Sequence, residues 1–78
     1  MRYEFYLNPR ENFHQDFENN EPYSEIYGNI NTAKIWAKHL LFCNNAASID
    51  FRSSNGRKLY NIDRKTVRVK YFGNVEEQ

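Results

Sequence analysis

The strongest structural signal in this 78-residue sequence is the dipeptide Asn55-Gly56, which lies between two segments of alternating polar and apolar residues. Both residues accept positive φ angles, so the pair favours a two-residue type I′ turn. Such a turn pairs Phe51 with Tyr60 and Ile49 with Ile62, and it places all four side chains on one face. The sequence therefore predicts an antiparallel hairpin with one buried side.

Three other segments alternate in the same way and predict further strands. They are residues 2–7, residues 23–27 and residues 66–72, the last following a tight turn at residues 63–65. In the last strand we expect the odd positions to face inward and the even positions outward. The inward set is Val67, Val69 and Tyr71, and the outward set is Arg68, Lys70 and Phe72.

One amphipathic helix is predicted from residue 31 or 32 to about residue 44. Asn31 or Thr32 is the expected N-cap, and Asn44-Asn45 is the expected end. The core-facing stripe has helical spacing and comprises Ala33, Trp36, Ala37, Leu40 and Leu41. The opposite side is unusually apolar, because it carries Ile35, His39 and Phe42.

Residues 9–18 are predicted either as a short acidic helix or as a loop. We expect Phe13 and Phe17 to cover the apolar outer side of the main helix at Ile35 and Phe42. If they do not, that side becomes an exposed patch that favours homodimer formation.

These elements predict an α+β fold, with an antiparallel β-sheet of four or five strands and one α-helix packed on one face. Residues 1–78 are expected to form one small domain, with 73–78 as a frayed tail. The sequence contains no apolar run long enough to span a membrane and no signal-peptide pattern, and its single cysteine excludes an internal disulfide. We therefore expect a soluble, cytoplasmic protein without a membrane partner.

Little in the sequence supports catalysis or metal binding. His14 and His39 are the only residues that titrate near neutral pH, and their spacing does not bring them together. His39 and Cys43 have helical i, i+4 spacing, but a structural zinc site needs four ligands. We expect Cys43 to be a small buried hydrophobic residue, and we predict no metal, no cofactor and no enzymatic activity.

The best candidate for function is a basic segment in the C-terminal half. Seven positive charges lie within nineteen residues, at Arg52, Arg57, Lys58, Arg64, Lys65, Arg68 and Lys70. Tyr6 and Phe72 are expected beside them on the outer face of the sheet, so these nine residues form the predicted binding surface. Cations next to aromatic rings suit a protein interface, and they also suit contact with phosphates and bases. A third interpretation is that the charges only protect exposed strands from edge pairing.

The charge is unevenly distributed along the chain. Residues 1–30 have a net charge of −4 and residues 31–78 a net charge of +5, although the whole chain has only +1. The acidic segment 11–25 could neutralise the basic hairpins, form a separate acidic patch, or be a solvated loop. We expect the solvated loop.

The segment GNINTAKIWAK at residues 28–38, between a strand and two hairpin-linked strands, resembles small phage-encoded α+β proteins. It is most similar to compact anti-CRISPR inhibitors, particularly one that inhibits type I-F systems. The shared features are the helix opening around Ala33-Lys34 and Ala37 and an Asn-Gly hairpin followed by basic strands. The resemblance implies a non-enzymatic protein that blocks the nucleic-acid site of a CRISPR effector. Because such blockers are often acidic, the net charge of +1 favours docking by shape and mixed charge over mimicry of DNA.

The sequence thus predicts a non-enzymatic binding module from a phage or mobile element. Its expected partner is a host protein or a nucleoprotein complex such as a CRISPR effector, in the cytoplasm of the host cell, where it would block nucleic-acid binding sterically. The alternative is a small nucleic-acid-binding protein that uses the basic sheet face and hairpin. Either protein could be a monomer or a homodimer.

Overall fold

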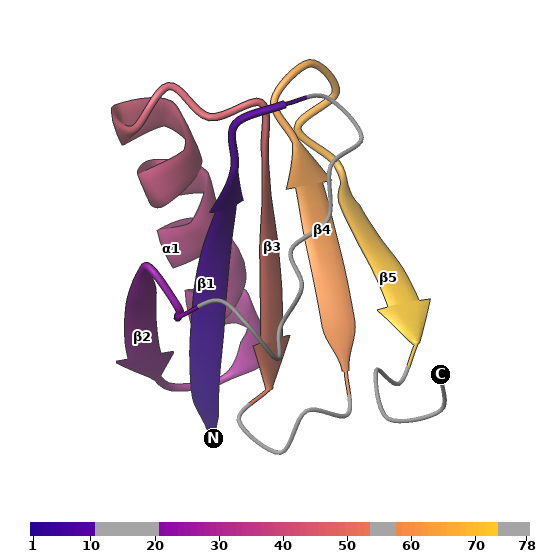
Figure 1. The fold of residues 1–78 in the computed structure, drawn as a ribbon. Coiled ribbons are helices and arrows are strands. Elements are labelled where there is room, and N and C mark those ends of the chain that lie inside the picture. Colours follow the sequence, from indigo (N-terminus) through magenta and orange to yellow (C-terminus); the bar gives the residue numbers. More distant parts are fainter. Residues whose placement is uncertain (11–20, 54–57, 74–78) are drawn as a thin grey trace.

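Five strands form one antiparallel sheet, and a single helix packs against one of its faces (Figure 1). The computed structural model describes residues 1–10, 21–53 and 58–73. In chain order the elements are β1 (Arg2–Asn8), β2 (Ser24–Tyr27), α1 (Ile30–Cys43), β3 (Ser48–Ser53), β4 (Leu59–Asp63) and β5 (Val69–Gly73). The strand order across the sheet is β2-β1-β3-β4-β5. The predicted α+β class and the packing of one helix on one face are confirmed.

The hairpin of β3 and β4 has the register that the Asn-Gly turn predicts. Phe51 lies opposite Tyr60, and Ile49 lies opposite Ile62. The backbone N–H of Ser53 also donates to the carbonyl of Lys58, with 3.2 Å between the two atoms. The turn residues 54–57 lie outside the described ranges. Pairing on both sides of the turn position therefore confirms the register.

The core lies between the sheet and α1 and is largely aromatic on the sheet side. The ring of Phe51 is stacked between Phe5 at 5.5 Å and Tyr60 at 5.2 Å, measured between ring centroids. Tyr3 packs against Phe51 edge-on. Such ring pairs add to the free energy gained from burying the apolar surface. These contacts join β1 to the hairpin of β3 and β4, which is distant from it in the sequence.

The helix uses the predicted stripe but begins earlier than predicted. Ala33, Ala37, Leu40 and Leu41 are buried, while Trp36 is half-buried and donates its Nε1–H to Ser24 Oγ at 3.2 Å. The N-cap is Asn29, whose side chain accepts from the backbone N–H of Thr32 at 2.9 Å, so the predicted cap at Asn31 or Thr32 is wrong. The predicted end is confirmed, because Asn44 is the C-cap and Asn45 has a φ of 54°.

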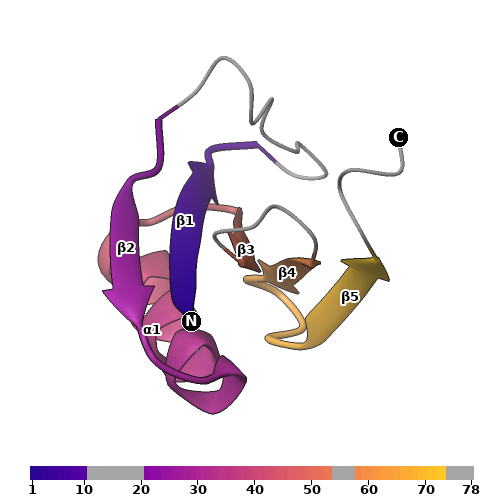
Figure 2. The ribbon, with the colours of Figure 1, turned by 90° about the horizontal axis from the view of Figure 1, so that it is seen from below.

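The helix covers only part of the sheet. Figure 2 shows α1 beside β2 and β1, with β5 at the other end of the sheet. On its outer side Ile35 and Phe42 are 72% and 48% exposed. The expected cover, Phe13 and Phe17, lies in residues 11–20 together with most of the possible helix at 9–18, outside the described ranges.

The last strand differs from its prediction in two ways. It begins at Val69 and not at Thr66, because Val67 has a φ of 55°, which a strand does not allow. Tyr71 faces the helix side as predicted but is 57% exposed, because β5 lies beyond the area that α1 covers. Gly73 belongs to β5 and not to the tail. Within the described ranges, no helix is long and apolar enough to cross a membrane.

Candidate functional site

The structure divides the nine predicted binding residues into three groups. Three are held by other parts of the fold: Tyr6, Arg52 and Arg64. Five are exposed to solvent: Lys58, Lys65, Arg68, Lys70 and Phe72. Arg57 lies in residues 54–57, outside the described ranges.

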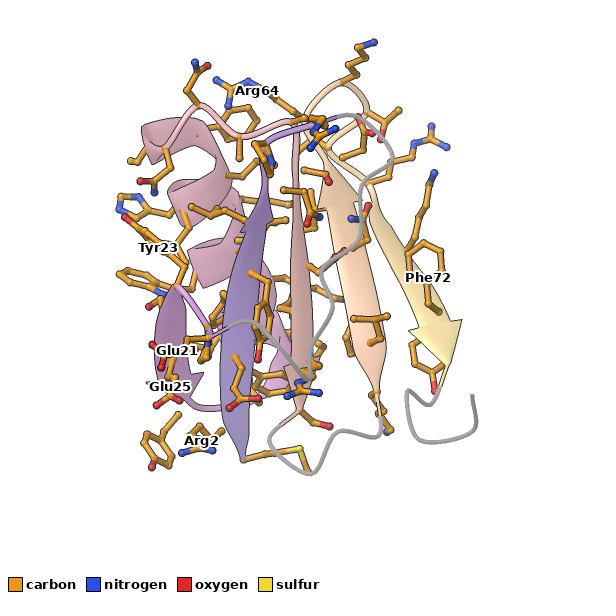
Figure 3. The ribbon with its side chains drawn as sticks, in the orientation of Figure 1. Arg2, Glu21, Tyr23, Glu25, Arg64 and Phe72 are labelled. Carbon is orange, nitrogen blue, oxygen red and sulfur yellow. The ribbon has the colours of Figure 1, made fainter. Side chains whose placement is uncertain are left out.

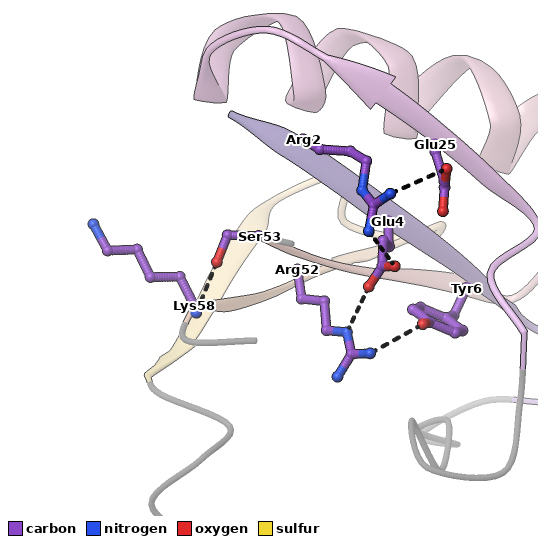
Figure 4. Close-up of polar contacts among 7 residues, drawn as sticks. All are labelled: Arg2, Glu4, Tyr6, Glu25, Arg52, Ser53 and Lys58. Atoms are coloured by element: carbon purple, nitrogen blue, oxygen red, sulfur yellow. Dashed lines mark hydrogen bonds and ion pairs between the residues drawn. The ribbon is translucent and has the colours of Figure 1, made fainter. Parts of the chain in front are cut away.

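Arg52 connects β3 to β1 on the helix-free face of the sheet (Figure 4). Its Nε donates to Glu4 Oε1 at 3.1 Å, and its Nη2 donates to the hydroxyl of Tyr6 at 3.3 Å. Glu4 also pairs with Arg2 at 3.5 Å. Tyr6 is only 2% exposed, and this burial raises the pKa of its phenol although the charge of Arg52 lowers it. Arg52 and Tyr6 therefore stabilise the sheet and are poor candidates for contact with a partner.

Arg64 reaches from the β4–β5 connection to the end of α1 (Figure 3). Its Nη1 donates to the carbonyl oxygens of Leu41 at 2.9 Å and Ala46 at 3.2 Å. The guanidinium carbon also lies 5.1 Å from the centroid of the Phe42 ring. A cation at this position satisfies helix carbonyls and interacts favourably with the negative end of the helix dipole. Arg64 thus has a structural role that its position in a basic run did not reveal.

The exposed residues lie on either side of β4 in the sequence. Lys58 precedes the strand, and its backbone N–H donates to Ser53 Oγ at 3.3 Å (Figure 4). The others follow the strand, in the β4–β5 connection and on β5. We call this second group the β5 strip, and it comprises Lys65, Arg68, Lys70, Tyr71 and Phe72. Tyr71 was missed as a site residue because its alternation with Val69 predicts a buried position.

The side chains of Tyr71 and Lys70, both in the β5 strip, lie on different faces of the sheet. Tyr71 pairs with Tyr60 on the helix side, with 5.2 Å between the ring centroids. Phe72 follows it, is 50% exposed and projects from β5 (Figure 3). Lys70 lies opposite Asn61 on the helix-free face. The strip therefore surrounds the edge of the sheet and is not a flat platform on one face.

The centre of the helix-free face holds buried polar groups that sequence analysis did not identify. Asp50 is fully buried, and its Oδ1 accepts from Asn61 Nδ2 at 2.8 Å. Asn8 is also fully buried and donates to Ser48 Oγ at 2.9 Å. Buried polar groups that bond one another stabilise a particular register. The sequence does contain a sign of this cluster, because Asn8, Asp50 and Asn61 are polar residues at outward-facing positions of three adjacent strands. Such positions usually face solvent, so the pattern alone does not predict burial.

The possible metal ligands do not form a site among the described residues. Cys43 is exposed, so the prediction of a buried cysteine is wrong. Its Sγ lies 3.8 Å from both ring nitrogens of His39, whose ring stacks on Trp36. Both residues lie on the outer side of α1, because its inner side is occupied by the buried stripe. The described ranges contain no group of three or more potential ligands, and His14 lies outside them.

Comparisons with known proteins find no matching family model, no matching curated protein and no matching solved structure. The resemblance to phage-encoded inhibitors therefore stays a prediction. We argue function below from the geometry of the described residues.

Proposed function

We propose that this chain is a binding module without catalytic chemistry, and that it docks through the β5 strip on an acidic surface of a host protein or nucleoprotein complex. The main support is the exposure of this strip. Arg68 and Lys70 extend from the end of the sheet beside two rings that are each at least half exposed. Arginine and aromatic residues at a surface are the usual anchors of protein interfaces.

The arrangement favours a protein partner over direct nucleic-acid binding. Stacking of successive bases needs freely accessible aromatic rings, whereas the ring of Tyr71 already packs against the ring of Tyr60. Arg52 and Arg64 are committed to Glu4 and to helix carbonyls. Fewer cations are therefore available for phosphates than the basic run of the sequence indicates.

The proposed mechanism is steric. A basic strip does not fit into a basic nucleic-acid channel, but it can bind acidic side chains at the rim of such a channel. The body of the domain would then occupy the space that the nucleic acid needs. Following the resemblance stated above, we propose a CRISPR effector of type I-F as the first partner to test.

The docking surface is tested with a charge-reversal variant, Arg68→Glu with Lys70→Glu. The matched control is Lys34→Glu with Lys38→Glu, which removes the same charge from the helix. Purified effector complex should bind the wild type and the control but not the β5 variant, in a pull-down at sub-micromolar concentration. Equal binding of both variants would refute the assigned surface.

The role as an inhibitor is tested in cells with an active type I-F system. Expression of the wild-type chain should restore plating of a targeted phage, and the β5 variant should not. If the wild type does not restore plating, the proposed partner is wrong.

The nucleic-acid alternative is tested with fluorescent single-stranded and duplex DNA. Tight binding with a log–log salt slope of about −0.9 per phosphate contact would favour it. Absence of binding at low salt would reject it.

A further inference from the structure

Among the described residues the sheet ends at β2 and at β5, and exposed charges of opposite sign lie along these two strands. β2 forms one edge, where Glu21 and Glu25 are exposed (Figure 3). β5 forms the other edge, with exposed Arg68 and Lys70. We propose that copies of this chain associate head to tail, with β5 of one copy adding to β2 of the next and extending the sheet. This property goes beyond the proposed function, because it needs no second protein.

The strand directions allow this addition if the second copy continues the twist of the sheet. Every neighbouring pair in the sheet is antiparallel, so β2, β3 and β5 all run in the same direction. A second copy that is shifted sideways and rotated to continue the twist places its β2 parallel to β5 of the first copy. All helices then lie on the same face of the extended sheet. A mixed sheet of this kind is common in proteins.

One register brings the complementary side chains together. Glu25 is opposite Glu4 and Lys70 is opposite Asn61, so both lie on the helix-free face. If Lys70 lies beside Glu25 of the next copy, the two charges pair on that face. The same register covers all four residues of β2, from Ser24 to Tyr27, with Val69 to Phe72.

This register also covers exposed aromatic surface. Phe72 falls beside Tyr27, which is 76% exposed, and Tyr71 falls beside the half-buried Ile26. These contacts remove apolar surface from water on both faces of the sheet. They also pair backbone groups that an edge strand leaves unpaired.

The charges disfavour the two symmetric alternatives. Pairing β2 with β2 would bring the acidic residues of both copies together, and pairing β5 with β5 would do the same for the basic residues. Charged side chains normally protect edge strands in this way, but opposite signs on the two edges leave head-to-tail pairing open. Arg2 Nη1 lies 3.8 Å from Glu25 Oε2 and partly neutralises the negative charge of Glu25. The exposed Glu21 adds a second negative charge at this edge.

The expected assembly is weak and open-ended. β2 is only four residues long, so the contact is smaller than a typical stable interface. Head-to-tail contacts that do not close into a ring produce growing chains of molecules. The weight-average mass should therefore rise continuously with concentration, without a plateau at the dimer.

The test is sedimentation of the purified chain between about 10 μM and about 1 mM, a range that detects millimolar dissociation constants. We expect the mass to rise with concentration at low salt, and to rise much less in about 1 M salt, where the Debye length is about 3 Å. A chain that stays monomeric at every concentration refutes the proposal.

Two charge variants identify the edges. We expect association to weaken at least about tenfold for Arg68→Glu with Lys70→Glu, and equally for Glu21→Lys with Glu25→Lys. An equimolar mixture should associate again, because each variant then offers edges complementary to the other. Lys34→Glu with Lys38→Glu should associate like the wild type. Circular dichroism confirms that each variant is folded.

Other outcomes would overturn the assignment of the edges. Association that the edge variants do not change would place the contact elsewhere, for example on the exposed patch of Ile35 and Phe42. If the mixture fails to associate, the two edges do not bind each other. Partner binding is measured at sub-micromolar concentration, where the chain is monomeric, so its failure and the failure of self-association are seen separately.

Discussion

Replacing Arg64 with alanine should destabilise the fold, although this arginine belongs to an exposed basic run in the sequence. The structure gives Arg64 two hydrogen bonds to carbonyls, one at the end of α1 and one just beyond it, at 2.9 and 3.2 Å. It also places the guanidinium 5.1 Å from the ring centroid of Phe42. Alanine removes all of these contacts.

The expected loss is about 2 kcal/mol. Hydrogen bonds to a charged donor contribute about 1.5–3 kcal/mol, and a cation–π contact at an exposed ring adds about 0.5–1 kcal/mol. The site is only partly buried, so water can satisfy some of the released carbonyls, and we take a value near the lower end. A domain of this length typically has a free energy of unfolding of about 4–12 kcal/mol. The variant would therefore lose a large fraction of it.

Urea unfolding followed by circular dichroism measures this loss. With a slope of about 1 kcal/mol per molar urea, the midpoint should fall by about 2 M. Arg68→Ala is the matched control, because it removes an exposed arginine from the same connection and should change stability by less than about 0.5 kcal/mol. If Arg64→Ala is as stable as Arg68→Ala, Arg64 does not hold the helix end and our reasoning fails.

Three further predictions concern the cap, the pH dependence and the core. Asn29→Ala should lower the free energy of unfolding, measured with urea, by about 1 kcal/mol, because the Asn29 side chain accepts from the backbone N–H of Thr32 at the start of α1. Asn31→Ala should lower it by less than about 0.5 kcal/mol. If Asn31→Ala has the larger effect, Asn31 is the N-cap and Asn29 is not. Burial raises the pKa of Tyr60, so the folded state holds that proton more tightly than the unfolded chain does. This stabilisation is present below about pH 10 and is lost as the pH rises through the folded pKa, so Tyr60→Phe should show a smaller fall of the urea midpoint at alkaline pH than the wild type. Phe51→Ala should cost about 3–5 kcal/mol and broaden or abolish the thermal transition; a fall in Tm of less than about 5 °C would mean that the core refills the space.

Local patterns predicted much of the fold. The Asn55-Gly56 turn and its alternating flanks specify the register of β3 and β4, because a one-residue shift would expose Phe51 and Ile49. The helical stripe likewise specifies which side of α1 is buried. The predicted N-cap is two or three residues too late, because Asn29, Asn31 and Thr32 lie within four residues and each can cap a helix. Val67 was placed in a strand because a positive φ at a β-branched residue has no local signal.

The candidate site was predicted less well, because sequence analysis treats all exposed cations alike. Arg52, Arg64 and Arg68 occur in the same basic run, yet within the part of the chain that the structure describes only the side chains of the first two donate hydrogen bonds. Their acceptors include Glu4 and the carbonyls of Leu41 and Ala46, which tertiary packing brings close. No spacing along the chain encodes these distances.

The sequence by itself determined most of the secondary structure, the hairpin register and the buried side of α1, because these depend on local periodicity and turn chemistry. It also determined that the N-terminal part is acidic and the C-terminal part basic. Only the tertiary structure decided that β1 lies between β2 and β3, which leaves β2 and β5 as the open edges. That order places the acidic N-terminal part and the basic C-terminal part at opposite edges of the sheet. The sequence alone does not reveal it, because pairing between distant strands depends on the shared core and not on any local pattern.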